Sequence, residues 1–191
     1  MSINRKQDII KAATQSFSSF GYKATTMDQV ARLANVGKGT IYTFFKNKEE
    51  LFNDIITTLI DDMENEAIQA ISPEKSFKEN LHDALYKMLE FRLEHQLTIK
   101  LFEEDRDFGT PIVQDGMKKL ESSILTFIKE KIEKAIDKKE IKQCNPEITA
   151  FVLLKLYIAL IVDWEKERKP LDKKEIANLF ELYIFEGLAF E

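Results

Sequence analysis

Residues 35–45, NVGKGTIYTFF, combine two glycines and a lysine with a run of hydroxyl-bearing and aromatic side chains. Glycines followed by a lysine can form a phosphate-binding loop, but that loop needs the pattern GxxxxGK and then Ser or Thr, directly after a strand. The GKGT of this segment lacks that spacing and follows a predicted helix. The same residue types fit a short helix that enters a DNA groove, because small side chains allow close approach and lysine and threonine can contact phosphates and base edges. The segment therefore favours DNA binding over nucleotide binding.

Two longer helices are predicted on either side of this segment. The first covers about residues 3–20, because apolar side chains recur at steps of three and four and Gly21 follows where a helix commonly ends. The other begins after Asn47, a candidate N-cap to which Glu50 can reach back. The core-facing residues are expected to be Ile10, Ala13, Phe17 and Phe20 in the first helix, and Leu51, Phe52, Ile55, Ile56, Leu59, Ile60, Met63 and Ala67 in the other.

Two short helices are predicted between them. One covers about residues 27–34, where Thr25 or Thr26 can be the N-cap and Gln29 stands three positions after Thr26, as in a capping box. Its inward residues are expected to be Val30, Leu33 and Ala34. After a break in the backbone, residues 38–45 leave room for about two turns. A supporting helix, a short helix, a turn and a second short helix form a helix-turn-helix arrangement.

The predicted helix over residues 38–45 has an inner and an outer face. Ile41 and Phe45 stand four residues apart, so both can anchor it in the three-helix core. The outer positions are Lys38, Gly39, Thr40, Tyr42 and Thr43. We expect the glycine to let the backbone approach DNA, the two threonines to contact base edges or a thymine methyl, and the lysine to reach guanine or phosphate.

Phosphate contacts are expected from the neighbours of these residues. Tyr42, Lys46 and the first amides of the long helix near Lys48 can hold phosphates, which orients a DNA-binding module without reading sequence. The alternative interpretation is that Tyr42 and Phe44 are core aromatics and that the lysines are solvated.

The distribution of charge agrees with a DNA-binding N-terminal segment. The whole chain carries a net charge of −5, which by itself argues against nucleic acid. Up to Lys48, however, eight basic residues stand against two acidic ones, a net charge of +6, so the remainder carries −11. A basic N-terminal quarter on an acidic body is expected of a chain with one polyanion-binding end, although chance clustering of solvated charge could produce it as well.

Composition predicts a globular protein of the cytoplasm. The 191 residues are 44% hydrophobic, enough for one substantial core or for a small domain joined to a larger one. The single cysteine excludes an internal disulfide, and the first residues turn polar before any apolar block forms, so no signal peptide is predicted. The longest apolar run, residues 150–162, contains Lys155 and is shorter than a membrane-spanning helix.

The segments TTMDQVA (residues 25–31) and VGKGTIYTFFKNKEEL (residues 36–51) resemble the N-terminal DNA-binding region of the tetracycline-repressor (TetR) family of bacterial transcription regulators. The resemblance extends over about residues 5–52. It implies an all-α homodimer of about nine helices per subunit. Residues 1–48 would form the helix-turn-helix DNA-binding domain, and residues 49–191 a helical ligand-binding and dimerisation domain.

The resemblance also implies site residues. The positions that match common DNA contacts of the family are Lys38, Gly39, Thr40, Tyr42, Thr43 and Lys48, while Thr25 and Thr26 match the start of a helix that contacts the DNA backbone.

The rest of the chain is predicted to be helical from its pattern alone. The expected helices cover about residues 74–96, 98–107, 111–138, 146–168 and 172–189. The last two are apolar over more than one face, and such helices need cover on more than one side. We expect them to meet their copies across a two-fold axis as a four-helix bundle, with core packing inside one subunit as the alternative. The stripe of the last helix consists of Ile176, Leu179, Phe180, Tyr183, Ile184 and Leu188.

A small-molecule effector of apolar or aromatic character is also expected. Ten of the 14 phenylalanines lie after residue 50, together with Trp164, although these side chains could equally form plain core.

No catalytic, metal or cofactor site is predicted. His82 and His95 are 13 residues apart and lack a metal-ligand pattern. The carboxylates Glu103, Glu104, Asp105 and Asp107 could bind a cation, but a solvated turn is the favoured interpretation. Cys144 has no neighbouring His or Lys arrangement that would mark a sensor thiol.

Three functions follow from these features. The first is a repressor that a ligand releases from a palindromic operator. The second is a DNA-binding dimer without a small-molecule effector, and the third is a helical small-molecule-binding protein or enzyme with a vestigial N-terminal motif.

Overall fold

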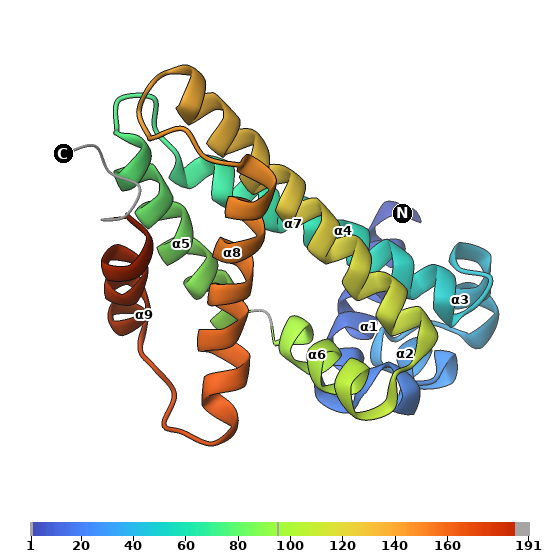
Figure 1. Ribbon diagram of the computed structural model, residues 1–191. Coiled ribbons are helices and arrows are strands. Elements are labelled where there is room, and N and C mark those ends of the chain that lie inside the picture. Colours follow the sequence, from blue (N-terminus) through green and yellow to red (C-terminus); the bar gives the residue numbers. More distant parts are fainter. Residues whose placement is uncertain (1, 95, 186–191) are drawn as a thin grey trace. The chain divides into compact units, whose positions relative to one another are not determined.

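The structure is a computed structural model that describes residues 2–94 and 96–185, and over these residues it contains nine α-helices and no strand (Figure 1). The all-α prediction is therefore confirmed. The helices are α1 (Ser2–Ala24), α2 (Met27–Leu33), α3 (Lys38–Phe44), α4 (Lys48–Ala70), α5 (Phe77–Glu94), α6 (Leu97–Phe108), α7 (Pro111–Asp137), α8 (Pro146–Ile158) and α9 (Lys173–Phe180).

The helices form two compact units. Unit 1 comprises Met1–Asp61 and His95–Leu120, and unit 2 comprises Asp62–Glu94 and Glu121–Glu191. Helices α4 and α7 contribute their first residues to unit 1 and their last residues to unit 2. In this division the first part of α4 and helix α6, which packs on α1, belong to unit 1, and the domain boundary expected after residue 48 stays a prediction.

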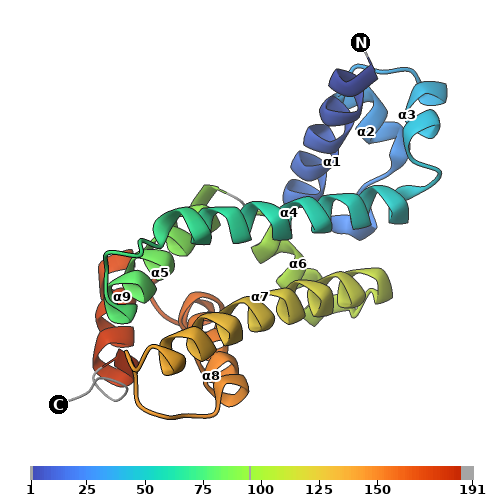
Figure 2. The same cartoon turned by 90° about the horizontal axis from the view of Figure 1, so that it is seen from above.

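Aromatic rings fill the core of unit 1. The ring of Phe52 lies 5.7 Å from that of Phe17 and 4.9 Å from that of Tyr22, in edge-to-face geometry that aromatic pairs prefer. Figure 2 shows α1, α2 and α3 beside the first turns of α4. The short helices are thus held by one common core rather than by their own length, since isolated helices of seven residues are not stable in water.

The predicted N-caps are present. Thr26 forms the capping box with Gln29, whose side-chain oxygen accepts the Thr26 N–H at 2.8 Å. Asn47 Oδ1 accepts the Glu50 N–H at 2.8 Å. The Glu50 carboxylate reaches back one residue further than predicted and accepts the N–H of Lys46 at 2.7 Å.

Among the inward positions predicted for α1 and α2, Ile10 and Ala34 are only half-buried, and two others lie at the surface. Phe20 and Leu33 are exposed, although both were expected in the core. Each stands at the end of a regular helical stretch. Gly21 breaks α1 directly after Phe20, with φ 82° and ψ 168°, and α2 ends at Leu33. The periodic pattern therefore holds only within each stretch.

Apolar side chains of α5, α7, α8 and α9 form the core of unit 2. The buried residues include Leu85, Leu89, Ile132, Leu153, Ile176 and Phe180. After α8 the chain continues through a wider π-type turn (Ala159–Asp163) and a 3-10 turn (Trp164–Lys166), so the helix predicted over residues 146–168 is largely confirmed. A second π-type turn, Glu181–Phe185, follows α9. Leu188, the end of the predicted helix over residues 172–189, and His95 lie outside the described residues.

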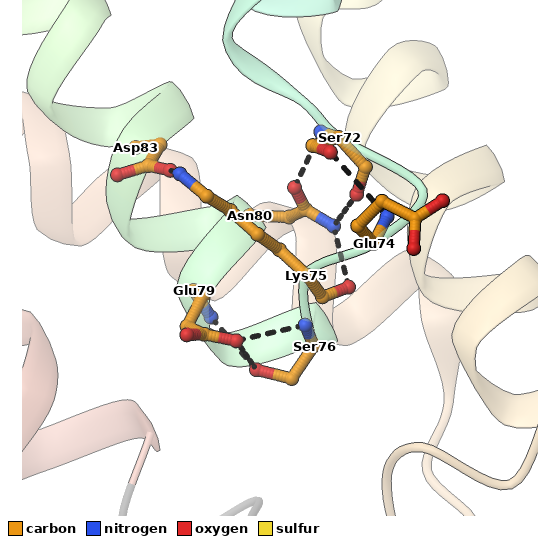
Figure 3. Close-up of polar contacts among 7 residues, drawn as sticks. All are labelled: Ser72, Glu74, Lys75, Ser76, Glu79, Asn80 and Asp83. Atoms are coloured by element: carbon orange, nitrogen blue, oxygen red, sulfur yellow. Dashed lines mark hydrogen bonds and ion pairs between the residues drawn. The ribbon is translucent and has the colours of Figure 1, made fainter.

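A polar cluster around Asn80 fixes the turn between α4 and α5 (Figure 3). Asn80 Oδ1 accepts the Ser72 N–H at 2.7 Å, and its amide group donates to the carbonyls of Ser72 (2.8 Å) and Lys75 (3.1 Å). At the start of α5, the Glu79 carboxylate accepts both the hydroxyl (2.7 Å) and the N–H (2.9 Å) of Ser76. These hydrogen bonds lower the pKa of Glu79.

Candidate nucleic-acid interface and ligand cavity

The exposed face of α3 carries the residues expected to meet DNA. Ile41 and Phe45 are buried, as predicted, and anchor the helix in unit 1. Lys38, Gly39, Tyr42 and Thr43 are exposed, and Thr40 is half-buried. Tyr42 is therefore not a core aromatic.

Gly39 lies on an open surface. A Cβ placed on Gly39 would meet no atom of the described chain within 4 Å. Packing inside the subunit therefore does not require a glycine here. A glycine at this position would instead allow an external partner to approach the α3 backbone closely.

The polar side chains of α3 make weak internal contacts at the surface. Lys38 Nζ lies 2.9 Å from the Asp28 carboxylate, and this hydrogen bond raises the pKa of the lysine. The Thr43 hydroxyl donates to the Thr40 carbonyl at 2.7 Å. Exposed contacts of this kind contribute little to stability, so they can be exchanged for contacts with DNA.

The two threonines before α2 have different roles. Thr26 is exposed and caps α2. Thr25 is fully buried, and its hydroxyl donates to the Gly21 carbonyl at 2.9 Å and lies 3.0 Å from the Ser16 hydroxyl. The Thr25 side chain therefore lies inside unit 1 rather than on its surface.

The Lys48 ammonium is hydrogen-bonded within unit 1. It donates to the carbonyls of Tyr22 and Thr25, both at 2.8 Å, and lies 4.2 Å from the centroid of the Tyr22 ring. Burial lowers its pKa. The Lys48 ammonium is thus bound within unit 1, and its contact with DNA stays a prediction, while Lys46 is exposed.

Glu104 binds the same stretch of backbone from helix α6. Its carboxylate accepts the N–H of Tyr22 at 2.5 Å, the N–H of Lys23 at 2.9 Å and the hydroxyl of Thr110 at 3.1 Å. Only 4% of Glu104 is exposed, so the residue does not lie in a solvated turn as expected. A Cβ on Gly21 would lie 2.6 Å from a Glu104 oxygen, which leaves room only for glycine.

Sequence reasoning missed Glu104 because its backbone partners, Tyr22 and Lys23, stand more than 80 positions away. The one local signal was Gly21, since a helix break leaves backbone N–H groups that need acceptors. That signal does not indicate which residue supplies the acceptor.

The other candidate residues that the structure describes form no reactive cluster. The rings of His82 and Tyr86 stack with centroids 6.2 Å apart. Glu103, Asp105 and Asp107 lie on α6. No group of three or more potential metal ligands occurs among the residues that the structure describes.

Unit 2 contains a partly open cavity of about 450 Å³, within the range of small-molecule sites. Residues from Met63 onward in α4 and residues of α5 and α7 line most of it, with Tyr157 of α8 and Phe180 of α9. Much of the lining is aliphatic and includes Ala67, Ile71, Leu81, Leu85, Ile128 and Leu153.

Helix α8 presents an apolar outer face. Ile148, Phe151 and Val152 are 61%, 49% and 44% exposed, and their spacing of three and four places them on one side of the helix. Beyond α9, Leu182 and Tyr183 are also exposed. Exposed apolar side chains grouped in this way indicate an interaction surface.

Comparison with known families assigns both parts of the chain. Residues 9–55 match the model of the bacterial regulatory proteins of the tetR family, and residues 74–188 match the tetracyclin repressor-like C-terminal domain. The HTH-type transcriptional regulator YhgD of Bacillus subtilis (strain 168) is 61% identical over 189 residues, which cover 99% of each chain. The chain therefore belongs to the TetR family and is a DNA-binding transcriptional regulator.

Solved structures show the same fold. The regulator FadR from Bacillus subtilis, in complex with stearoyl-CoA, is 18% identical with a TM-score of 0.77, and the match covers 91% of this chain and 94% of FadR. SmeT, in complex with triclosan, is 17% identical with a TM-score of 0.79, and the match covers 98% of this chain and 92% of SmeT. In the parts of the chain that the structure describes, no helix is both long and apolar enough to span a membrane.

Proposed function

We propose that this regulator is a homodimeric repressor that an apolar or aromatic small molecule releases from a palindromic operator. The observation that carries the proposal is the largely apolar cavity of about 450 Å³ in unit 2. Because operator DNA is the target, the cytoplasm is the compartment in which the protein acts.

Dimerisation pairs the two DNA-binding surfaces. The exposed apolar face of α8 and the segment that follows α9 meet their copies across a two-fold axis, as the sequence pattern predicts. The two α3 helices then enter successive major grooves, roughly 34 Å apart, so the operator has two-fold symmetry.

The proposed contacts divide into two kinds. Base edges are read from α3, by Lys38, Thr40 and Thr43, with Gly39 at the closest approach of the backbones. Phosphates are held by Thr26, Tyr42 and Lys46, which fix the register without reading sequence. Thr25 and Lys48 support these residues from inside unit 1.

The ligands of two similar structures support the proposed class of effector. One contains stearoyl-CoA and the other triclosan, both with large apolar parts. A ligand weakens operator binding only to the extent that it prefers the conformation that fits DNA poorly, and a tenfold effect requires about 1.4 kcal/mol of coupling.

The test begins with operator sequences selected from random duplex DNA by the full-length protein. Fluorescence anisotropy then measures operator affinity with and without a panel of apolar and aromatic compounds. Release by at least one compound, with a palindromic selected site, supports the proposal. Specific binding that no compound weakens favours the DNA-binding dimer without an effector, and failure to select any sequence favours the small-molecule-binding protein.

Two substitutions test the division of the DNA contacts. Thr43→Ala should relax base preference at one position of each half-site, because it removes a side chain that faces the bases. Lys46→Ala should weaken binding to all DNA sequences alike. It should also lower the slope of log affinity against log salt concentration by about 1 per subunit. Wild-type preference and affinity in both variants would remove these residues from the interface.

A further inference from the structure

The neutral polar side chains that line the cavity are already hydrogen-bonded within unit 2. Both amide hydrogens of Asn80 bind the carbonyls of Ser72 and Lys75 (Figure 3). The Tyr157 hydroxyl donates to the Met88 carbonyl at 3.3 Å. A ligand therefore finds mainly apolar surface along this part of the wall, and few donors for neutral polar groups.

Charged residues of the lining carry a positive excess. Four lysines, Lys75, Lys131, Lys134 and Lys138, stand against two glutamates, Glu64 and Glu140, so the formal sum is 4 − 2 = +2. Lys75 is paired with Asp83 at 2.5 Å and Lys138 with Glu140 at 3.8 Å. Among the described residues, no carboxylate lies within 4.0 Å of the ammonium of Lys131 or Lys134.

These two lysines lie at one end of the cavity wall formed by α7. Ile124 lines the cavity about ten residues before Lys134, which corresponds to roughly 15 Å along a helix. Figures 1 and 2 place the end of α7 and the turn between α4 and α5 at the same end of unit 2. The Lys131 ammonium lies 4.8 Å from the centroid of the Phe127 ring, at the border between apolar and charged lining.

This wall is apolar and ends in cations with no carboxylate partner. It matches a ligand that has an apolar chain and a negatively charged end. We propose that the cavity binds a single-chain amphiphile with an anionic head group, an inference that rests on the proposed ligand-binding function. The hydrocarbon chain lies along α7 toward Ile124, and the anionic head meets Lys131 and Lys134. Each buried methylene then contributes to affinity, while the head group sets the orientation.

The experiment compares two probes of equal chain length, hexadecanoate and hexadecan-1-ol, both below the concentration at which they aggregate. Equilibrium dialysis measures their binding to the full-length protein, and anisotropy measures release of the selected operator. Hexadecanoate should bind at least tenfold more tightly than the alcohol. Its advantage should shrink as salt rises, because screening weakens contacts between exposed charges.

Three variants locate the two parts of the ligand. Lys131→Met with Lys134→Met should reduce hexadecanoate affinity about tenfold or more and leave the alcohol unchanged. Lys129→Met is the matched control, because this lysine lies on the same helix but pairs with Glu133 and does not line the cavity. Ala84→Trp places a large ring on a lining residue of α5 and should abolish binding of both probes. Circular dichroism and operator affinity check that each variant is folded.

Different results overturn the two proposals. Equal binding of the two probes, no binding of either, or a double variant that behaves like Lys129→Met would overturn the anionic head group. The proposed effector function would survive each of these results if another compound of the panel releases the operator and Ala84→Trp prevents that release. It fails if no compound releases the operator, or if Ala84→Trp leaves the release unchanged.

Discussion

Glu104 and Lys48 hold the same short stretch of backbone with opposite charges. The carboxylate accepts the N–H groups of Tyr22 and Lys23, and the ammonium donates to the carbonyls of Tyr22 and Thr25. Charge-assisted hydrogen bonds of this kind are stronger than neutral ones, and losing one partner leaves buried polar groups unsatisfied. The direction in which the chain leaves α1 toward α2 therefore depends on two residues outside both helices.

Replacement of Glu104 should destabilise unit 1. In Glu104→Gln, one amide hydrogen faces a backbone N–H that previously had an acceptor, so we expect a loss of about 2 kcal/mol. For a chain of this length, that loss lowers Tm by roughly 4–8 °C. Operator affinity should fall as well. Differential scanning calorimetry and anisotropy measure the two effects.

Glu103→Gln is the control for this prediction. Glu103 stands next in sequence but forms a partly exposed ion pair with Lys100 at 3.1 Å, so its loss should cost less than about 1 kcal/mol. Equal effects of the two substitutions would show that the contacts of Glu104 have no special role.

Two glycines of unit 1 lie in opposite environments. Gly116 of α7 faces α4 so closely that a Cβ would lie 2.9 Å from the Phe52 ring and 3.3 Å from Ile56. Gly39 of α3 has open space instead. Helix propensity favours alanine at both positions. The effect of Gly→Ala on stability at the two sites therefore distinguishes the contribution of packing from that of helix propensity.

Gly116→Ala should destabilise the protein and Gly39→Ala should not. A methyl group against the buried Phe52 ring forces repacking that costs about 1–3 kcal/mol, more than the gain of about 1 kcal/mol in propensity. Gly39→Ala should leave stability unchanged or slightly raised, yet weaken operator binding. Urea unfolding and anisotropy measure both. A stabilised Gly116→Ala variant would contradict the close packing of α4 and α7, and full operator affinity in Gly39→Ala would contradict a close approach of α3 to DNA.

The proposed dimer gives the whole molecule its specificity, since one α3 helix reads only half of an operator. The outer face of α8 contains a phenylalanine, Phe151, that is 49% exposed. Burial of such a side chain against its copy contributes to association, whereas an aspartate there would bring two carboxylates into the interface beside Lys155, which already pairs with Glu121.

Phe151→Asp should therefore convert the dimer of 2 × 22.2 = 44.4 kDa into a monomer of 22.2 kDa. Operator affinity should fall by about 100-fold or more because the two half-sites are no longer bound together. Light scattering measures the mass. Phe108→Asp is the matched control, since this phenylalanine of unit 1 is 65% exposed and lies on α6. A dimeric Phe151→Asp variant would move the interface away from this face of α8.

Sequence patterns predicted most helices and the two faces of α3 correctly. The capping box at Thr26, the cap at Asn47 and the buried pair Ile41 and Phe45 all depend on residues within four positions of each other. Such signals are local, so they can be read before the chain is folded. The same patterns failed at Phe20 and Leu33, where a helical stretch ends.

The amino-acid sequence alone thus established an all-helical TetR-family regulator and the residues that face outward from α3. Only the tertiary structure decided that the side chains of Thr25 and Lys48 are hydrogen-bonded within unit 1, that Glu104 binds the backbone after α1, and that lysines border an apolar cavity in unit 2. The physical reason is that burial and hydrogen bonding of these residues depend on partners brought together by packing, often from distant positions in the chain. Periodicity and capping report only on near neighbours.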